Sequence, residues 1–262
     1  MAARAQKRRF YRLITATMVT GKIHSIETMG ALDGPGLRYV LFMKGCPFRC
    51  AYCHNPDTWA APAAMGKSAH EVAEDVLKYR EFFEAAGGGF TASGGEPLMQ
   101  ADFLGQLLQI LKSSGIHTAV DTCGYVDITA EIERVVDLAD LFLLDIKHLD
   151  DTRHKELTGR SNDKVLNFLN FISQKGKDIN IRIVLLNGYT ADEDYLKRTA
   201  EFLKSYPTIS RLDLLPYHTL GVGKWRALGI PYRLDESALL RPEQKEKARQ
   251  IFEDAGFNTT LQ

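Results

Sequence analysis

From residue 37 onward, short apolar runs rich in β-branched residues alternate with longer stretches in which apolar residues recur every three or four positions. The short runs have the length and composition of buried strands, and the longer stretches have the period of amphipathic helices. Regular alternation of strand and helix is typical of repeated βα units around a parallel sheet. The pattern predicts six core strands, at residues 37–43, 89–92, 117–121, 141–146, 180–186 and 211–215.

The segments between these strands carry recognisable helix starts. Ser68 and Glu71 form a capping-box pattern, which predicts one helix that runs to the glycines at 87–89. Thr190 and Glu193 form a second such pattern, ahead of a helix at 195–206. Further helices are expected at 101–113, 130–138, 164–174 and 242–255, with an additional strand at 22–28 before the repeat.

No linker divides this repeat, so residues 18–262 are expected to form a single domain. Residues 1–17 hold several Lys and Arg residues and no acid, and the stretch after Arg8 and Arg9 is too short and too polar for an export signal. We predict a disordered basic tail there, with Met18 as an alternative start.

The overall charge gives no sign of a nucleic-acid partner, because 33 Lys and Arg balance 33 Asp and Glu. The chain has no apolar run of transmembrane length, which speaks against a membrane role. The four cysteines suit a reducing compartment rather than a disulfide scaffold, and a cytoplasmic location is expected.

Polar and small residues follow the predicted strands at their carboxyl ends. In a closed or partly closed parallel barrel these ends share the face on which active sites are built. Arg182, inside the fifth strand, alternates with apolar neighbours and is expected to point into the barrel, where a buried guanidinium needs an anionic partner. The residues at the strand ends are Cys46, Cys50, Cys53, Ser93, Gly94, Gly95, Glu96, Asp121, Thr122, Asp145, Lys147, Asn187, Gly188 and His218.

The most informative feature is the spacing of Cys46, Cys50 and Cys53, which reads C-x3-C-x2-C. One loop can wrap three such thiolates around an iron–sulfur cube and supply no fourth ligand, which leaves one iron open for chemistry.

The cysteines have three other interpretations. A closed zinc site would need His54 as fourth ligand, although a histidine directly after a cysteine seldom reaches the same ion. The segment 50–54 also fits covalent haem attachment, which leaves Cys46 unused and requires export. Structural thiols or a disulfide do not account for three cysteines within eight residues, since only Cys123 lies elsewhere. Cys123 itself is expected to be a packed free thiol rather than a cluster ligand.

Each remaining residue also has an ordinary structural explanation. Gly94 and Gly95 can form a tight turn, Asp121 and Asp145 can cap helices, and Lys147 and His218 can be a solvated charge and a turn residue.

The cysteine spacing together with the strand-end Gly-Gly-Glu resembles the radical S-adenosylmethionine (SAM) superfamily. Within it, the chain from about residue 19 onward resembles the activating enzymes of pyruvate formate-lyase. The resemblance rests on residues 33–38 (DGPGLR), 52–59 (YCHNPDTW), 91–97 (TASGGEP), 121–122 (DT), 144–147 (LDIK) and 215–218 (LPYH).

This resemblance implies an α/β fold with a partial (β/α)6 barrel, a radical SAM core whose parallel sheet is open at one side. It implies an enzyme, a radical SAM oxidoreductase with a [4Fe–4S] cluster and SAM as cofactors. Reductive cleavage of SAM would produce a radical that removes hydrogen from a glycine Cα of pyruvate formate-lyase. A flavodoxin or ferredoxin is the expected electron donor, and the protein is expected to be a monomer.

The resemblance also implies roles for individual residues. Cys46, Cys50 and Cys53 would bind the cluster, and Asp33 would meet the glycine loop of the partner. SAM would be bound by Tyr52, Cys53, His54, Gly95, Asp145, Ile146, Lys147, Arg182 and His218. A monovalent cation, Na⁺ or K⁺, would be held by Asp121, Thr122, the Leu143 carbonyl and Asp145.

Two absences favour pyruvate formate-lyase as the partner: residues 59–91 contain no cysteine of a ferredoxin-like insert, and the chain is longer than the activase of anaerobic ribonucleotide reductase. Two alternatives stay open. One is a radical SAM enzyme that acts on another glycyl-radical enzyme or on a small molecule. The other is a non-catalytic iron–sulfur or zinc protein, which would have no use for SAM.

Overall fold

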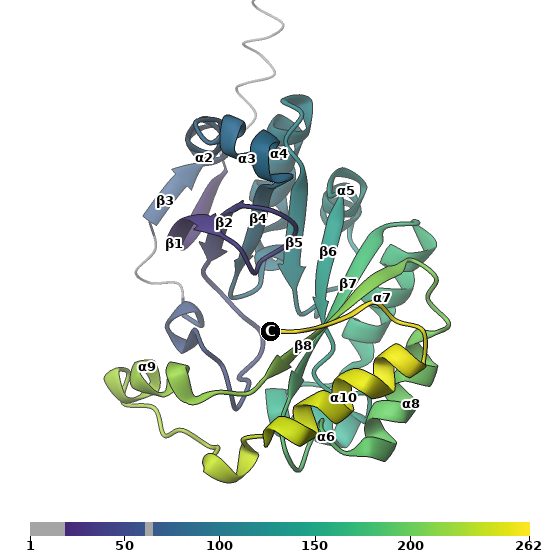
Figure 1. Ribbon diagram of the computed structural model, residues 1–262. Helices are drawn as coiled ribbons and strands as arrows, with labels where there is room; N and C mark the ends of the chain where they lie inside the picture. The colour runs from purple at the N-terminus through teal and green to yellow at the C-terminus, as the bar shows by residue number, and fades with distance from the viewer. Residues whose placement is uncertain (1–18, 61–64) are drawn as a thin grey trace, which may run out of the picture.

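The computed structural model describes residues 19–60 and 65–262, and these residues form one sheet of nine strands in the order β3-β1-β2-β4-β5-β6-β7-β8-β9 (Figure 1). The expected tail at 1–17 and the alternative start at Met18 lie outside the described residues. The strands are β1 Thr20–Gly30, β2 Arg38–Met43, β3 Met65–Ser68, β4 Gly89–Gly94, β5 Thr118–Thr122, β6 Leu141–Asp145, β7 Asp178–Leu185, β8 Ile209–Pro216 and β9 Thr259–Leu261.

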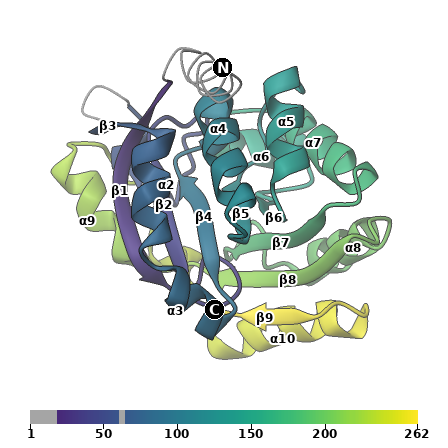
Figure 2. The same ribbon diagram turned by 90° about the horizontal axis from the view of Figure 1, so that it is seen from above.

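The sheet is mostly parallel, as predicted. All neighbours from β2 to β9 pair in parallel, whereas β1 lies antiparallel between β2 and β3. β3 and β9 are its two edges, so the sheet curves without closing. Figure 2 shows this curve from above, with α2, α4, α5, α7, α8 and α10 outside it. The six predicted core strands and the additional strand are confirmed, and the fold is an open, partial α/β barrel.

Most helices cover the outer face of this sheet, whereas the short helix at residues 222–227 packs near residues 56–58. The helices are α2 Ala69–Leu77, α3 Arg80–Ala86, α4 Ala101–Ser113, α5 Ala130–Leu138, α6 Asp151–Thr158, α7 Asp163–Gln174, α8 Glu193–Leu203, α9 Val222–Ala227 and α10 Pro242–Asp254. None of the helices in the described part of the chain is long and apolar enough to cross a membrane.

The helix predicted from Ser68 to the glycines at 87–89 is in fact two helices. The Ser68–Glu71 capping box is present, but α2 ends at Leu77 and α3 begins at Arg80. Tyr79 lies at the break and its ring packs 5.8 Å from that of Tyr39. At the point where the two helices meet, the chain thus contacts a core residue.

The second predicted capping box is wrong. Asp192, not Thr190, caps α8, and its carboxylate accepts a hydrogen bond of 3.0 Å from the Tyr195 N–H. The Thr190 hydroxyl donates instead to the Val184 carbonyl at 2.6 Å and accepts from the Leu186 N–H at 2.8 Å. Thr190 therefore fixes the turn that follows β7.

The bottom of the barrel holds a small apolar cluster of Ala119, Leu141 and Leu143. Arg38, the first residue of β2, is fully buried at the amino end of the strands. Its guanidinium donates to Thr91 Oγ1 at 2.9 Å and to the Phe90 carbonyl. Burial lowers the pKa of Arg38 to about 10. A buried cation with these hydrogen bonds anchors β2 to β4 beneath the carboxyl-end face.

Candidate active site

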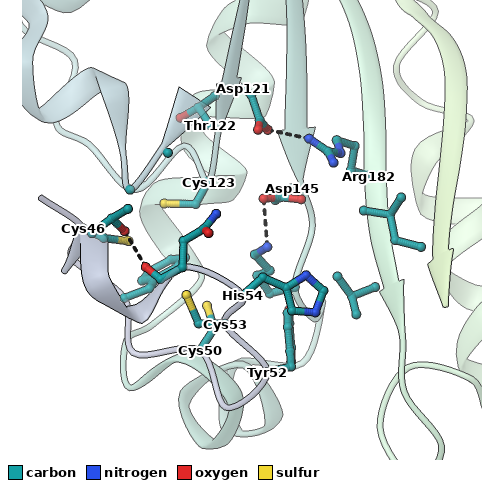
Figure 3. A pocket seen from close by; sticks show the side chains of 18 of the residues that line it. Cys46, Cys50, Tyr52, Cys53, His54, Asp121, Thr122, Cys123, Asp145 and Arg182 are labelled. Atoms are coloured by element: carbon teal, nitrogen blue, oxygen red, sulfur yellow. Dashed lines mark hydrogen bonds and ion pairs between the residues drawn. The ribbon is translucent and has the colours of Figure 1, made fainter. Parts of the chain in front are cut away.

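The three cysteines lie on a loop after β2, and their thiols face a cavity of about 440 Å³ (Figure 3). The outer side of this loop is held by α6, because the Arg49 and Ala51 N–H groups donate to the Thr158 and Leu157 carbonyls, each at 2.8 Å. The loop closes on itself through a bond of 2.8 Å from the Gly45 N–H to the Thr58 carbonyl. All four cysteines of the chain are free.

Burial raises the pKa of all three thiols of this loop, that of Cys50 to about 12. They are therefore neutral near pH 7 unless a metal displaces their protons. Within residues 19–60 and 65–262, no three His, Cys, Asp or Glu side chains lie close enough together to bind a single metal ion. An iron–sulfur cube bonds each thiolate through a different iron, so three thiols around a wider cavity are a suitable donor set.

The Gly-Gly-Glu turn after β4 packs directly on the cysteine loop. Gly94 has φ +108°, and a Cβ on Gly95 would lie 2.2 Å from the Gly45 carbonyl oxygen. The Gly95 N–H donates to the Met43 carbonyl at 2.8 Å. Glycine is thus required here by backbone packing, and only the Gly95 carbonyl is left for a ligand in the cavity.

Glu96 is fully buried and holds the end of β5 in place, a role that the sequence analysis missed. Its carboxylate accepts from Thr122 Oγ1 at 2.7 Å, from the Cys123 N–H at 2.8 Å and from the Leu98 N–H at 3.0 Å. Burial raises its pKa, and these donors oppose that effect. Cys123 is buried, as expected of a packed thiol, and lies at the cavity wall. The signal in the sequence for the role of Glu96 is its position directly after the strand-end pair Gly94 and Gly95.

Two ion pairs occupy the opposite wall of the cavity. The Arg182 guanidinium lies 3.0 Å from Asp121, and the Lys147 ammonium lies 2.8 Å from Asp145. Ser93 also donates to Asp121 at 2.6 Å. Burial alone would lower the pKa of Arg182 and of Lys147, but the neighbouring carboxylates raise both above their ordinary values. The prediction that Arg182 points into the barrel is confirmed.

Asp33 lies at the mouth of the cavity. Its backbone carbonyl accepts a hydrogen bond of 2.7 Å from Thr91 Oγ1, the same hydroxyl that Arg38 contacts. Burial, together with the charge of Asp121, raises the pKa of the Asp33 carboxyl to about 6.

Aromatic side chains line the cavity next to Cys53. The rings of His54 and His218 stack with centroids 4.1 Å apart. The Tyr52 hydroxyl is buried without a hydrogen-bond partner among the described residues, with Lys147 5.5 Å from its ring centroid. Trp225, whose role the sequence did not suggest, donates from its indole N–H to the Cys53 carbonyl at 2.8 Å.

The structure brings almost all of the predicted site residues to one cavity. Those at its wall are Asp33, Cys46, Cys50, Tyr52, Cys53, His54, Gly95, Asp121, Thr122, Asp145, Lys147, Arg182 and His218. Leu143 and Ile146 are not among the lining residues, because both side chains are buried in the protein core. Asn187 bonds to the Ser237 carbonyl, away from the cavity.

Comparison with known proteins shows the family to which the chain is similar. Residues 40–203 match the model of the radical SAM superfamily. The pyruvate formate-lyase-activating enzyme of Listeria monocytogenes is 41% identical over 246 residues, which cover 92% of this chain and 99% of the relative.

Two solved structures are also similar. A domain of a pyruvate-formate lyase-activating enzyme from Bacteroides vulgatus has a TM-score of 0.56 at 31% identity, over 67% of this chain and 99% of that chain. Streptococcus suis SuiB, solved with its precursor peptide SuiA, has a TM-score of 0.67 at 16% identity, over 88% of this chain and 49% of that chain. At that identity SuiB supports the fold alone.

Proposed function

Because the chain belongs to the radical SAM superfamily and, within it, to the family of pyruvate formate-lyase-activating enzymes, we propose that it activates a pyruvate formate-lyase by removing hydrogen from a glycine Cα of that partner. The observation that carries the proposal is the convergence of three free thiols and two cationic side chains, Lys147 and Arg182, on one cavity.

The thiols of Cys46, Cys50 and Cys53 would hold a [4Fe–4S] cluster with one iron free for SAM. With SAM bound, such a cluster supplies reductive cleavage of the sulfonium bond and a 5′-deoxyadenosyl radical. The protein contributes position, charge and exclusion of water.

Lys147 and Arg182 are the groups suited to the SAM carboxylate, since both are cationic and lie at the cavity wall. The amino group of SAM is a donor and needs an acceptor, which the Gly95 carbonyl can provide. Tyr52, Cys53, His54 and His218 would enclose the adenosine. Asp145 and Ile146 would contact SAM from the end of β6, Ile146 through its backbone because its side chain is buried.

The proposed cation site requires a rearrangement of the ion pairs. Asp121 and Asp145 are each neutralised by a protein cation in the structure. If Arg182 and Lys147 turn to the SAM carboxylate, the two aspartates are free to bind Na⁺ or K⁺ together with Thr122 and the Leu143 carbonyl. We propose that the cation and SAM bind as a pair, because the cation would compensate the two aspartates that lose their protein cations to the SAM carboxylate.

We propose that the glycine loop of the partner enters past Asp33, on the open side of the barrel. Such a contact requires a mobile segment in the partner and is transient. An acidic flavodoxin or ferredoxin would supply the electron. The protein would act as a monomer in the cytoplasm, where its cysteines stay reduced.

The test is anaerobic reconstitution with iron and sulfide, followed by reduction and electron paramagnetic resonance with and without SAM. A cube-type spectrum that shifts when SAM is added, and a glycyl radical that appears when pyruvate formate-lyase is included, are expected. A SAM-dependent shift with 5′-deoxyadenosine but no glycyl radical would instead favour another substrate. A cluster that does not respond to SAM, or no cluster, would overturn the catalytic assignment.

A further inference from the structure

Three exposed arginines surround the solvent side of the cysteine loop: Arg49, Arg160 and Arg233, referred to below as the arginine rim. Arg49 donates to the Cys46 carbonyl at 2.9 Å and to the Phe48 carbonyl at 2.7 Å. Arg233 donates to the Arg49 carbonyl at 3.0 Å, and Arg160 approaches the Pro47 carbonyl at 3.4 Å. Backbone carbonyls of the loop therefore hold all three guanidinium groups.

The arginine rim is not neutralised by carboxylates of the described residues. Among the ion pairs of residues 19–60 and 65–262, the arginines that take part are Arg80, Arg153, Arg182, Arg211 and Arg249. Asp235, the acid closest to Arg233 in sequence, accepts instead from the Ser237 N–H at 2.8 Å. The chain has no net charge, so the three guanidinium groups of the rim create a local positive field.

The rim lies directly behind the thiols. Arg49 is exposed while the next residue, Cys50, is only 9% exposed, so the two side chains face opposite sides of the loop. The Arg49 guanidinium also lies 4.9 Å from the ring centroid of Trp59, and Trp59 lines the same cavity as Cys53. The rim therefore contacts an aromatic residue of the cavity wall.

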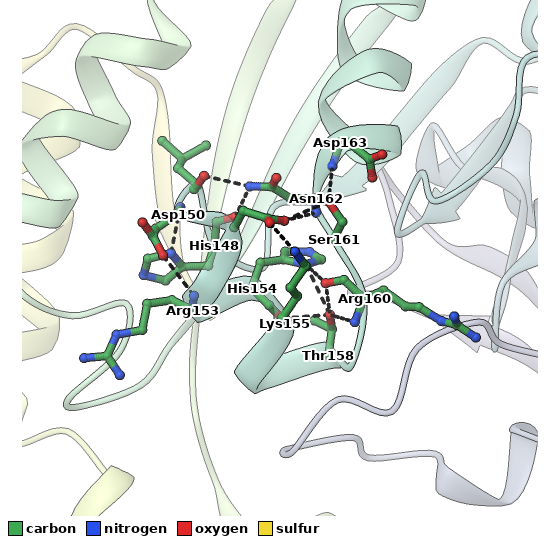
Figure 4. A network of polar contacts seen from close by, with 12 residues as sticks. His148, Asp150, Arg153, His154, Lys155, Thr158, Arg160, Ser161, Asn162 and Asp163 are labelled. Carbon is green, nitrogen blue, oxygen red and sulfur yellow. Dashed lines mark hydrogen bonds and ion pairs between the residues drawn. The ribbon is translucent and has the colours of Figure 1, made fainter.

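A polar network at α6 fixes the backbone of Arg160, one member of the rim (Figure 4). His154 Nδ1 contacts the Arg160 carbonyl at 2.7 Å, and the Thr158 hydroxyl donates to the His154 carbonyl at 2.8 Å. Asp151 accepts from Ser161 Oγ at 2.7 Å. The rim is therefore held at its base by carbonyls of the cysteine loop and, at Arg160, by the α6 network.

We propose that the arginine rim is the docking surface for an acidic one-electron carrier protein that reduces the cluster. This inference rests on the proposed function and adds the place where the electron enters. Electron transfer becomes much slower with distance, and the rim lies on the loop that carries the thiols. Complementary charge accelerates and orients such encounters, whose interfaces are small and short-lived.

The substrate protein is expected at a different surface. The cavity mouth is lined by Asp33 and by Leu32, which is 64% exposed, whereas none of the rim residues lines the cavity. The two partners can therefore bind at the same time, one behind the cluster loop and one over the cavity.

The experiment compares Arg160→Glu/Arg233→Glu with Arg134→Glu/Arg198→Glu, a matched control that reverses two exposed, unpaired arginines of the described residues on α5 and α8. Arg49 is left unchanged because its guanidinium donates to the carbonyl of Cys46, a proposed cluster ligand. Affinity for a flavodoxin, and separately for a 2[4Fe–4S] ferredoxin, is measured by calorimetry on the full chain before and after reconstitution. Formation of 5′-deoxyadenosine is then measured with either carrier and with dithionite.

We expect the rim variant to lose affinity for the carriers by on the order of tenfold or more at low salt, with the difference shrinking as salt screens the charges. Carrier-driven turnover should fall while dithionite-driven turnover stays within about twofold of the parent protein. Which carrier binds more tightly identifies the class of donor.

Unchanged carrier affinity in the rim variant overturns the proposal, and so does an equal loss in the control. Weakened binding of pyruvate formate-lyase with unchanged carrier binding overturns it as well, by assigning the rim to the substrate. If the parent protein cleaves no SAM even with dithionite, the proposed function fails, and the affinities measured before reconstitution still decide whether the rim binds acidic carriers.

Discussion

The Arg182 guanidinium lies 3.0 Å from the Asp121 carboxylate, so that a cation on β7 meets an anion on β5 across the intervening strand. The two side chains are only 14% and 15% exposed. Removing one member of a buried pair leaves the other without compensation. We therefore expect Arg182→Met to destabilise the protein by about 3 kcal/mol in urea unfolding.

Asp121→Asn in the same chain should recover part of that loss, because it removes the uncompensated charge. SAM affinity should remain weak in both variants, since neither has the guanidinium. An Arg182→Met protein as stable as the parent would show that Asp121 finds another partner.

Cys50→Ala should abolish cluster assembly and all SAM cleavage, because two thiols cannot hold the cube in the arrangement proposed here. Iron and sulfide content after reconstitution, with electron paramagnetic resonance, measures the effect. Cys123→Ala is the matched control: it removes a buried thiol at the same cavity wall and should keep the cluster. Full turnover in Cys50→Ala, or a cluster lost equally in both variants, would argue against the ligand assignment.

Sequence patterns predicted the core strands and the clustering of polar residues at their carboxyl ends, because both follow from local period and from the geometry of parallel sheets. β3 and β9 were not predicted, since strands of four and three residues leave too short a pattern. Likewise, the contact of Trp225 with Cys53 joins residues 172 positions apart and leaves no local signal. The spacing of Thr190 to Glu193 fits a capping box, but tertiary hydrogen bonds decide the place of Thr190.

Trp225→Phe should lower the thermal unfolding midpoint by about 2–4 °C. The indole is buried and loses its bond to the Cys53 carbonyl, a loss of about 1 kcal/mol. Tyr206→Phe removes a solvent-exposed bond to Asn170 and serves as the control, with almost no expected change. Equal shifts of the unfolding midpoint of the two variants in scanning calorimetry would mean that burial of the Trp225 hydrogen bond adds nothing to stability.

Asp33→Ala is expected to preserve slow SAM cleavage and to depress activation of the partner. Asp33 lies at the cavity mouth and not among the groups suited to SAM. The two reactions are followed separately, by chromatography of 5′-deoxyadenosine and by the glycyl radical signal. Equal loss of both would mean that Asp33 acts on SAM and not at the glycine loop.

Asp33 should also make stability depend on pH. Its pKa is about 6 in the folded protein against 3.8 ordinarily, so between these values the folded state keeps a proton that the unfolded state has lost. Stability then decreases as pH rises from about 4 to about 6, by up to about 3 kcal/mol. Asp33→Asn removes this cost, and its advantage over the parent protein in urea unfolding should grow across that window and stay constant above it. If the stabilities of the parent protein and of Asp33→Asn change with pH in parallel, the raised pKa of Asp33 is contradicted.

The two edges of the sheet are its shortest strands, Met65–Ser68 and Thr259–Leu261. An open sheet exposes unpaired backbone groups at each edge, and long flat edges invite other chains to add a strand. Here each edge offers only a few such groups, which limits aggregation by strand addition. The barrel can therefore stay open at one side without the loss of solubility that an open sheet usually risks.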